Sequence, residues 1–137
     1  MSACTFFGHR ECPDSISPAL VQTVERLICE EGVDSFYVGH QGRFDALVRG
    51  VLRQMQEKHP HIRFGVVLAY FPTGEGEADT MFSEGLEAVH PKFALDRRNR
   101  WMIDRSSYAV GYVKHGWGGA AKYMNVAKSK GRRLIFL

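Results

Sequence analysis

The stretch SFYVGHQG, residues Ser35–Gly42, indicates the fold class, because a short apolar segment ends there in a tight turn with glycine at both ends. From Arg43 to about Lys58 the sequence changes to a helical pattern with apolar residues on one face. These apolar residues are Phe44, Leu47, Val48, Val51, Leu52 and Met55. A strand that leads through a turn into an amphipathic helix is the repeating unit of α/β proteins with parallel sheets.

The same alternation extends along the chain in both directions. Strands are predicted at about Ala3–Phe7, Ser35–Val38, Ile62–Tyr70, Tyr108–Val113 and Arg133–Leu137. Helices are predicted from Ser17 to a stop at Gly32, at Arg43–Lys58, near Met81–Glu87, at Arg97–Arg105 and at Gly119–Lys130. The acidic segment Pro72–Glu77 is interpreted as a mobile loop.

Right-handed crossovers between these strands predict the order 3-2-1-4-5. We therefore expect a Rossmann-like three-layer α/β sandwich of about five mostly parallel strands, with helices on both faces, as one domain over residues 1–137. The order reverses between the first and fourth strands, and such sheets bind ligands at that reversal, beyond the carboxyl ends of the strands. The loops expected there are Gly8–Arg10 and Lys114–Gly119, with Gly39–Gly42 beside them.

Composition places the chain among ordinary globular proteins. Its 137 residues are 45% hydrophobic and 24% charged, with a formal net charge of +3. The longest apolar stretches, such as Phe64–Phe71, are too short to span a bilayer, and no basic-then-apolar signal segment follows Met1. We therefore expect a cytoplasmic protein with no membrane partner. The three cysteines, an odd number without Cys-x-x-Cys spacing, argue against a disulfide framework or a structural zinc site.

Several residues in the expected ligand-edge loops suit a nucleotide. The turns Gly39–Gly42 and Gly118–Gly119 both open helices, where backbone N–H groups and the helix dipole favour a phosphate, although glycine is also ordinary turn chemistry. Arg10 would clamp a phosphate, or lie on the surface. Trp117 would stack on a base, or pack as a lid over the sheet edge. Asp45 would hold a ribose hydroxyl, or complement the dipole of its helix.

Three histidines, His9, His40 and His115, also fall in these loops. No His-x-x-x-His or carboxylate spacing supports a metal site, so neutral hydrogen-bonding roles are favoured and no metal or other cofactor is predicted. No pair of residues forms a recognisable acid/base dyad.

Four motifs, in order along nearly the whole chain, resemble the YpsA-like branch of the SLOG superfamily. TFFGHR at Thr5–Arg10 resembles its Phe-Thr-Gly-His-Arg opening, and GHQGRFD at Gly39–Asp45 its Gly-x-x-x-Gly-Phe-Asp element, with Arg43 in place of a glycine. RNRWMID at Arg98–Asp104 is similar to its Arg-Asn-x-x-Met-Val-Asp stretch, and Gly118–Ala120 to its Gly-Gly-Thr.

The resemblance implies a Rossmann-like fold that binds nucleotides or nucleotide-derived ligands. The superfamily includes the lonely-guy phosphoribohydrolases and the DNA-binding protein DprA, and the YpsA-like branch is mostly proposed to sense nucleotide signals. Carried over by motif, the pocket residues are Gly8, Arg10, Gly39, Gly42, Asp45, Arg98, Asn99, Gly118 and Gly119. His9 and Trp117, placed by their loops, complete the predicted ligand-binding set.

Three departures from the family pattern concern catalysis. Ala120 replaces a threonine, Ser107 replaces an aspartate, and Lys122 stands where the phosphoribohydrolases have a glutamate. Arg98 does match their catalytic arginine. Glycosidic cleavage passes through a cationic sugar that a carboxylate stabilises and an ammonium does not. The same hydrolysis is therefore disfavoured, unless Asp45 or another acid substitutes.

The favoured function is binding or sensing of a nucleotide or nucleotide-derived small molecule at the carboxyl edge of the strands. One alternative is an N-glycosidase or phosphoribohydrolase acting on nucleoside monophosphates, with Arg98 as its catalytic residue. A second, less favoured alternative is nucleic-acid binding through two basic clusters. These clusters are Arg97, Arg98, Arg100 and Arg105, and Lys128, Lys130, Arg132 and Arg133. Relatives in the superfamily often form dimers, so the resemblance leaves a homodimer open.

Overall fold

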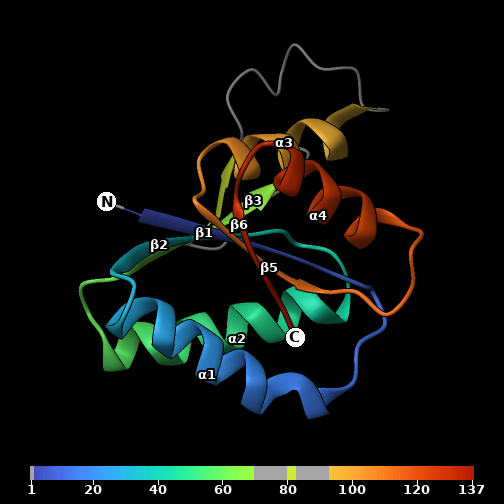
Figure 1. The fold of residues 1–137 in the computed structure, drawn as a ribbon. Coiled ribbons are helices and arrows are strands. Elements are labelled where there is room, and N and C mark those ends of the chain that lie inside the picture. The colour runs from blue at the N-terminus through green and yellow to red at the C-terminus, as the bar shows by residue number, and fades with distance from the viewer. Residues whose placement is uncertain (1, 70–79, 83–92) are drawn as a thin grey trace.

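Strands and helices alternate along the part of the chain that the computed structural model describes, which is residues 2–69, 80–82 and 93–137 (Figure 1). The strands are β1 (Ser2–Gly8), β2 (Val33–Val38), β3 (Arg63–Leu68), β4 (Thr80–Phe82), β5 (Tyr108–Tyr112) and β6 (Arg133–Phe136). The helices are α1 (Ser17–Cys29), α2 (Gly42–Lys58), α3 (Ala94–Asp104) and α4 (Gly119–Ser129), and a short 3₁₀ helix, η1 (Asp14–Ile16), precedes α1.

The strands form a sheet in the order β4-β3-β2-β1-β5-β6, and every neighbouring pair is parallel. The five predicted strands take the predicted order, which confirms the Rossmann-like α/β class. The order reverses between β1 and β5, which pair from Cys4↔Tyr108 to Gly8↔Tyr112.

The edge strand β4 was not predicted. Met81 and Phe82 were expected in a short helix, but they pair with Val67 and Leu68 of β3. That expectation is wrong for these two residues, because a three-residue strand is too short to show a period in the sequence. The remainder of the expected helix, up to Glu87, and the Pro72–Glu77 loop lie outside the described residues.

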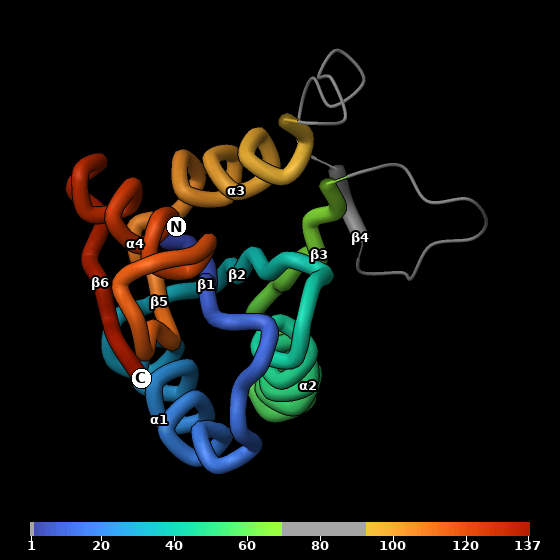
Figure 2. The backbone as a smooth tube through the Cα atoms, turned by 90° about the vertical axis from the view of Figure 1, so that its right-hand side faces the viewer, coloured from blue at the N-terminus to red at the C-terminus, as the bar shows by residue number. Residues whose placement is uncertain are grey.

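Helices cover both faces of the sheet. Figures 1 and 2 show α1 and α2 on one face and α3 and α4 on the other. Successive residues of a strand point to opposite faces, so Phe6 and Phe7 of β1 enter different cores. Phe6 lies 6.1 Å from the Phe36 ring beneath α1 and α2, and Phe7 lies 5.6 Å from the Tyr123 ring of α4.

None of the described helices is long and apolar enough to cross a membrane.

Candidate functional site

A cavity of about 670 Å³ opens at the carboxyl ends of β1, β2 and β5, the edge to which the strand order points. Loops and helices distant in sequence meet there. The predicted site residues around it are Gly8, His9, Arg10, Gly39, Asp45, Arg98, Asn99, Trp117, Gly118 and Gly119. The structure thus brings together residues from four separate segments of the chain.

Gly42 is the predicted site residue that is not among the described residues lining the cavity. It begins α2 with a φ of +85°, and an added Cβ would lie 2.7 Å from the Cα atom of Arg10. The next residue, Arg43, donates its backbone N–H to the Arg10 carbonyl at 2.7 Å. Gly42 therefore lets the β1 loop pack against the start of α2, which positions Arg10, rather than forming the cavity wall.

Two buried charged residues lie side by side in the cavity wall: Arg98 of α3 and Asp45 of α2 are 4% and 8% exposed. Arg98 donates from Nη1 to the Val67 carbonyl at 2.9 Å and from Nε to Asn99 Oδ1 at 2.6 Å. Asp45 Oδ2 accepts the Gln41 backbone N–H at 3.0 Å. These partners compensate the desolvation of both charges.

Gly39 is the residue that lets this pair form. A Cβ at this position would lie 2.7 Å from Arg98 Nη1 and 2.8 Å from Asp45 Oδ2. Both charged groups therefore approach the backbone at the end of β2 more closely than any residue with a Cβ atom at position 39 would allow. Gly39 has a packing role here, beyond ordinary turn chemistry.

The pKa of Asp45 is raised above its usual value. Burial is the main cause, while the Gln41 hydrogen bond and the charge of Arg98 act in the opposite direction. A buried carboxyl with a raised pKa in a cavity is a common feature of functional sites.

Three aromatic rings form a continuous stack on one side of the cavity. The His9 and His115 ring centroids are 3.9 Å apart, and those of His115 and Trp117 are 3.7 Å apart, with interplanar angles of 18° and 15°. Tyr112 of β5 meets His9 edge-on at 5.7 Å. Trp117 ends the stack and is 72% exposed, so it is not packed as a lid over the sheet edge.

Hydrogen bonds orient the two histidines of the stack. His9 Nε2 accepts the Lys114 backbone N–H at 2.9 Å, which leaves the proton of the neutral ring on Nδ1. Nδ1 of His115 donates to the Trp117 carbonyl at 2.8 Å. The pKa of His9 is lowered, first by burial and then by the nearby His115. The neutral form of His9 is therefore favoured at neutral pH.

The N-terminus of α4 forms a further part of the cavity wall. Gly118 precedes the helix with a φ of +90°, a conformation that favours glycine, and Gly118, Gly119 and Ala120 all line the cavity. The first N–H groups of a helix have no partner within it, and the helix dipole adds positive potential. This end of α4 therefore suits an anionic group.

Two of the three residues that depart from the YpsA-like pattern are not among the described residues that line the cavity. Lys122 Nζ is 3.6 Å from Asp96 Oδ1, and Lys122 is not among the described lining residues. Ser107 precedes β5, at the opposite edge of the sheet, where its N–H donates to the Ala3 carbonyl. Of the three departures, Ala120 alone faces the cavity.

Sequence reasoning did not single out several residues that line the cavity. Gln41 accepts a 3.1 Å hydrogen bond from Arg10 Nη2, and Tyr112 and Tyr123 contribute ring surface. Tyr123 lies one helical turn after Gly119, a spacing that places both on one face of α4 and that could have identified it. Gln41 lies inside the predicted turn Gly39–Gly42, and Tyr112 lies at the carboxyl end of a predicted strand, so their positions indicated this edge although neither residue was singled out.

A similar solved structure is the X-ray structure of DNA processing protein A (DprA) from Streptococcus pneumoniae, with a TM-score of 0.70 and 14% sequence identity. The match covers 99% of this chain and 50% of that one, so this chain spans about half the length of that structure. No protein-family model and no curated protein matches the sequence. The chain is an α/β protein with a DprA-like Rossmann-like fold.

Proposed function

We propose that this protein binds a nucleotide or nucleotide-derived small molecule in the cavity at the carboxyl edge of its sheet. The observation that carries the proposal is the combination, around one space, of an anion-attracting helix end and an exposed aromatic stack. Gly118 and Gly119 form the helix end, and Trp117 is the outermost ring of the aromatic stack. The volume of about 670 Å³ lies within the range of small-molecule sites.

The parts of a nucleotide match parts of this wall. Phosphate oxygens would accept N–H bonds at the start of α4 and from Arg10, whose guanidinium Gln41 orients. The base would stack on the open face of Trp117. A ribose hydroxyl would bond Asp45. The motif resemblance to the YpsA-like branch of the SLOG superfamily supports the same ligand class and a sensing role.

Binding is favoured over N-glycosidic cleavage because the carboxylate that would stabilise a cationic sugar is replaced at its expected position. The position that carries a glutamate in the phosphoribohydrolases is Lys122, an ammonium paired with Asp96. Asp45 is held by Gln41 and lies beside the positive charge of Arg98. That environment suits orientation of a ligand better than stabilisation of a cationic sugar.

Isothermal titration calorimetry with AMP, ADP, GMP and ADP-ribose tests the proposal. We expect binding by the wild type, and Trp117→Ala to weaken it by about tenfold, since base–aromatic stacking contributes ~1–3 kcal/mol. Phe136→Ala, which removes another exposed ring (59%) on β6, is the matched control and should bind normally. Absence of binding at millimolar concentration for the whole panel would refute the proposal.

Product analysis of the same mixtures separates binding from catalysis. Free base released by wild type and lost in Arg98→Ala would instead establish the N-glycosidase alternative. Intact nucleotide after long incubation, together with measurable affinity, is the result expected for a binding protein.

Nucleic acid is the second candidate, favoured by one observation, the DprA-like fold of a DNA processing protein. The exposed Trp117 beside Lys114 would stack a base of a single strand. Binding of single-stranded DNA that weakens steeply with salt and is lost in Trp117→Ala would support this candidate. Mononucleotide affinity without DNA affinity would exclude it.

A further inference from the structure

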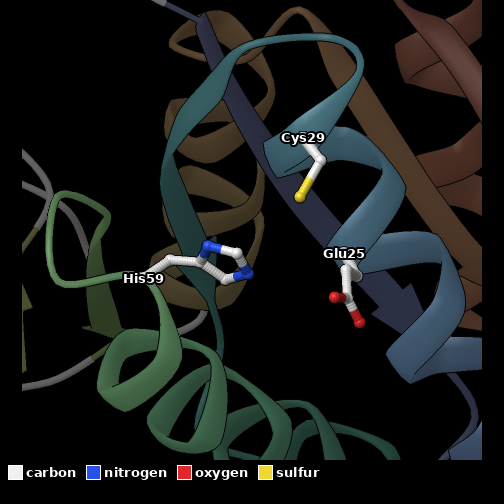
Figure 3. A group of neighbouring side chains, drawn as sticks. All are labelled: Glu25, Cys29 and His59. Atoms are coloured by element: carbon white, nitrogen blue, oxygen red, sulfur yellow. The ribbon is translucent and has the colours of Figure 1, made fainter.

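A second group of side chains lies on the other side of the molecule from the cavity. The C-terminal ends of α1 and α2 lie at the edge where β2 and β3 begin, opposite to the ligand edge. Glu25 and Cys29 are four residues apart on α1 and therefore share a face. His59 directly follows α2, and Figure 3 shows its ring turned toward both.

The three residues offer one ligand atom each, all within 4.8 Å of one another. A carboxylate oxygen, a thiolate sulfur and an imidazole nitrogen are the three donor types that zinc takes in proteins. Bond lengths of about 2.0–2.3 Å place tetrahedral ligand atoms about 3.6 Å apart. Small side-chain rotations would close the remaining distance, and these are open to the exposed Cys29 and the half-buried Glu25.

His59 supplies an independent indication. Its Nε2 atom is buried and has no hydrogen-bond partner within the described part of the chain. A buried polar atom without a partner is costly, and bonding to a cation would remove that cost. In Figure 3 this nitrogen lies on the side of the ring nearest Glu25 and Cys29.

We propose that Glu25, Cys29 and His59 form a Zn²⁺ site that clips the end of α1 to the end of α2. Three protein ligands leave a fourth position for water, as in zinc sites that stay open to solvent. Binding replaces the thiol proton of Cys29, which is released to solvent, by a zinc–sulfur bond. The site is separate from the nucleotide cavity and does not depend on its function.

Lys58 is a built-in competitor of this site. Its Nζ atom lies 2.5 Å from Glu25 Oε1, in a pair that raises the pKa of Lys58 and lowers that of Glu25 through their hydrogen bond. The ammonium pairs with Oε1 of Glu25 and repels Zn²⁺, and its side chain, which is 59% exposed, can move into solvent when the metal binds. Removing the ammonium should therefore tighten metal binding.

Titration of the full chain with Co²⁺, followed by competition with Zn²⁺, tests the site. Wild type should bind one Co²⁺ with a sulfur-to-cobalt charge-transfer band, which reports on a thiolate ligand directly. Cys29→Ser should abolish the band, and Glu25→Gln and His59→Ala should each weaken binding at least about tenfold. The matched controls Cys12→Ser, Glu30→Gln and His40→Ala, which change other copies of the same residue types, should bind like wild type.

Lys58→Gln should bind Co²⁺ and Zn²⁺ several-fold more tightly than wild type, a gain that misfolding would not produce. The proposal is overturned if wild type shows no thiolate band, if Cys29→Ser binds as wild type does, or if the controls lose affinity equally. Unchanged or weaker binding by Lys58→Gln would also count against it.

Discussion

Gly8→Ala is the substitution for which the structure gives the sharpest expectation. Gly8 ends β1 at the cavity, and a Cβ atom there would lie 2.2–2.5 Å from Cγ, Cδ1 and Cδ2 of Phe44. Ordinary contacts begin near 3.4 Å, so the ring would have to move by about 1 Å. Phe44 is fully buried and its ring is stacked against that of Tyr112, with centroids 6.4 Å apart, so the close packing of the core opposes that movement.

Overpacking of a close-packed core costs about 1–3 kcal/mol, and a rigid ring places Gly8→Ala at the upper end of that range. A loss of ~3 kcal/mol lowers the melting temperature of a chain of this size by about 10 °C. Urea unfolding followed by circular dichroism measures the free energy of unfolding. Gly50→Ala is the control, because an added Cβ there meets none of the described atoms within 4 Å and alanine favours the helix.

The double variant Gly8→Ala/Phe44→Leu tests the cause. A smaller side chain at Phe44 makes room for the new methyl group, so the two changes should cost about 1–3 kcal/mol less together than the sum of their separate costs. A Gly8→Ala protein within about 0.5 kcal/mol of wild type, or strictly additive costs in the double variant, would refute the reasoning.

Three further outcomes are expected. Burial raises the pKa of Asp45, so the folded state keeps this proton to a higher pH than the unfolded state does. The contribution of Asp45 to the free energy of unfolding is therefore complete below pH 3.8 and is lost as the pH rises through the raised pKa. Urea unfolding between acid and neutral pH should show Asp45→Asn losing less stability over this window than wild type, and parallel curves would contradict this. Gly118 has a φ of +90°, so Gly118→Ala should lower the free energy of unfolding by roughly 1–3 kcal/mol in the same assay. Gly119→Ala should be nearly neutral, because its added Cβ meets no described atom within 4 Å. Equal losses for the two variants would argue against backbone strain at Gly118. Cys4 is buried, which raises the pKa of its thiol, whereas Cys29 is exposed. A thiol reagent should therefore label Cys29 in the native protein and Cys4 only after unfolding, as measured by mass spectrometry of the labelled peptides. Fast labelling of Cys4 in the native protein would contradict its burial.

Much of the fold follows from local patterns. The apolar segments, their lengths and the helical faces between them predict five strands in the order that the sheet has, because right-handed crossovers leave few other arrangements. The edge strand Thr80–Phe82 escaped prediction, since its place is set by pairing with β3 and not by any period of its own. Local sequence patterns therefore predict the five longer strands, whereas the position of β4 depends on its pairing with β3 in the folded sheet.

The glycine turns and their position at the strand ends were readable from the residues alone, because turn chemistry and strand direction are local properties. The stack of His9, His115 and Trp117 was not, because the predicted strand order places β1 beside β5 but does not give the loop conformations that bring the three rings into contact. The same holds for the pairing of Lys122 with Asp96 and for the cluster of Glu25, Cys29 and His59. Such contacts depend on distances through space between segments, and tertiary packing sets those distances.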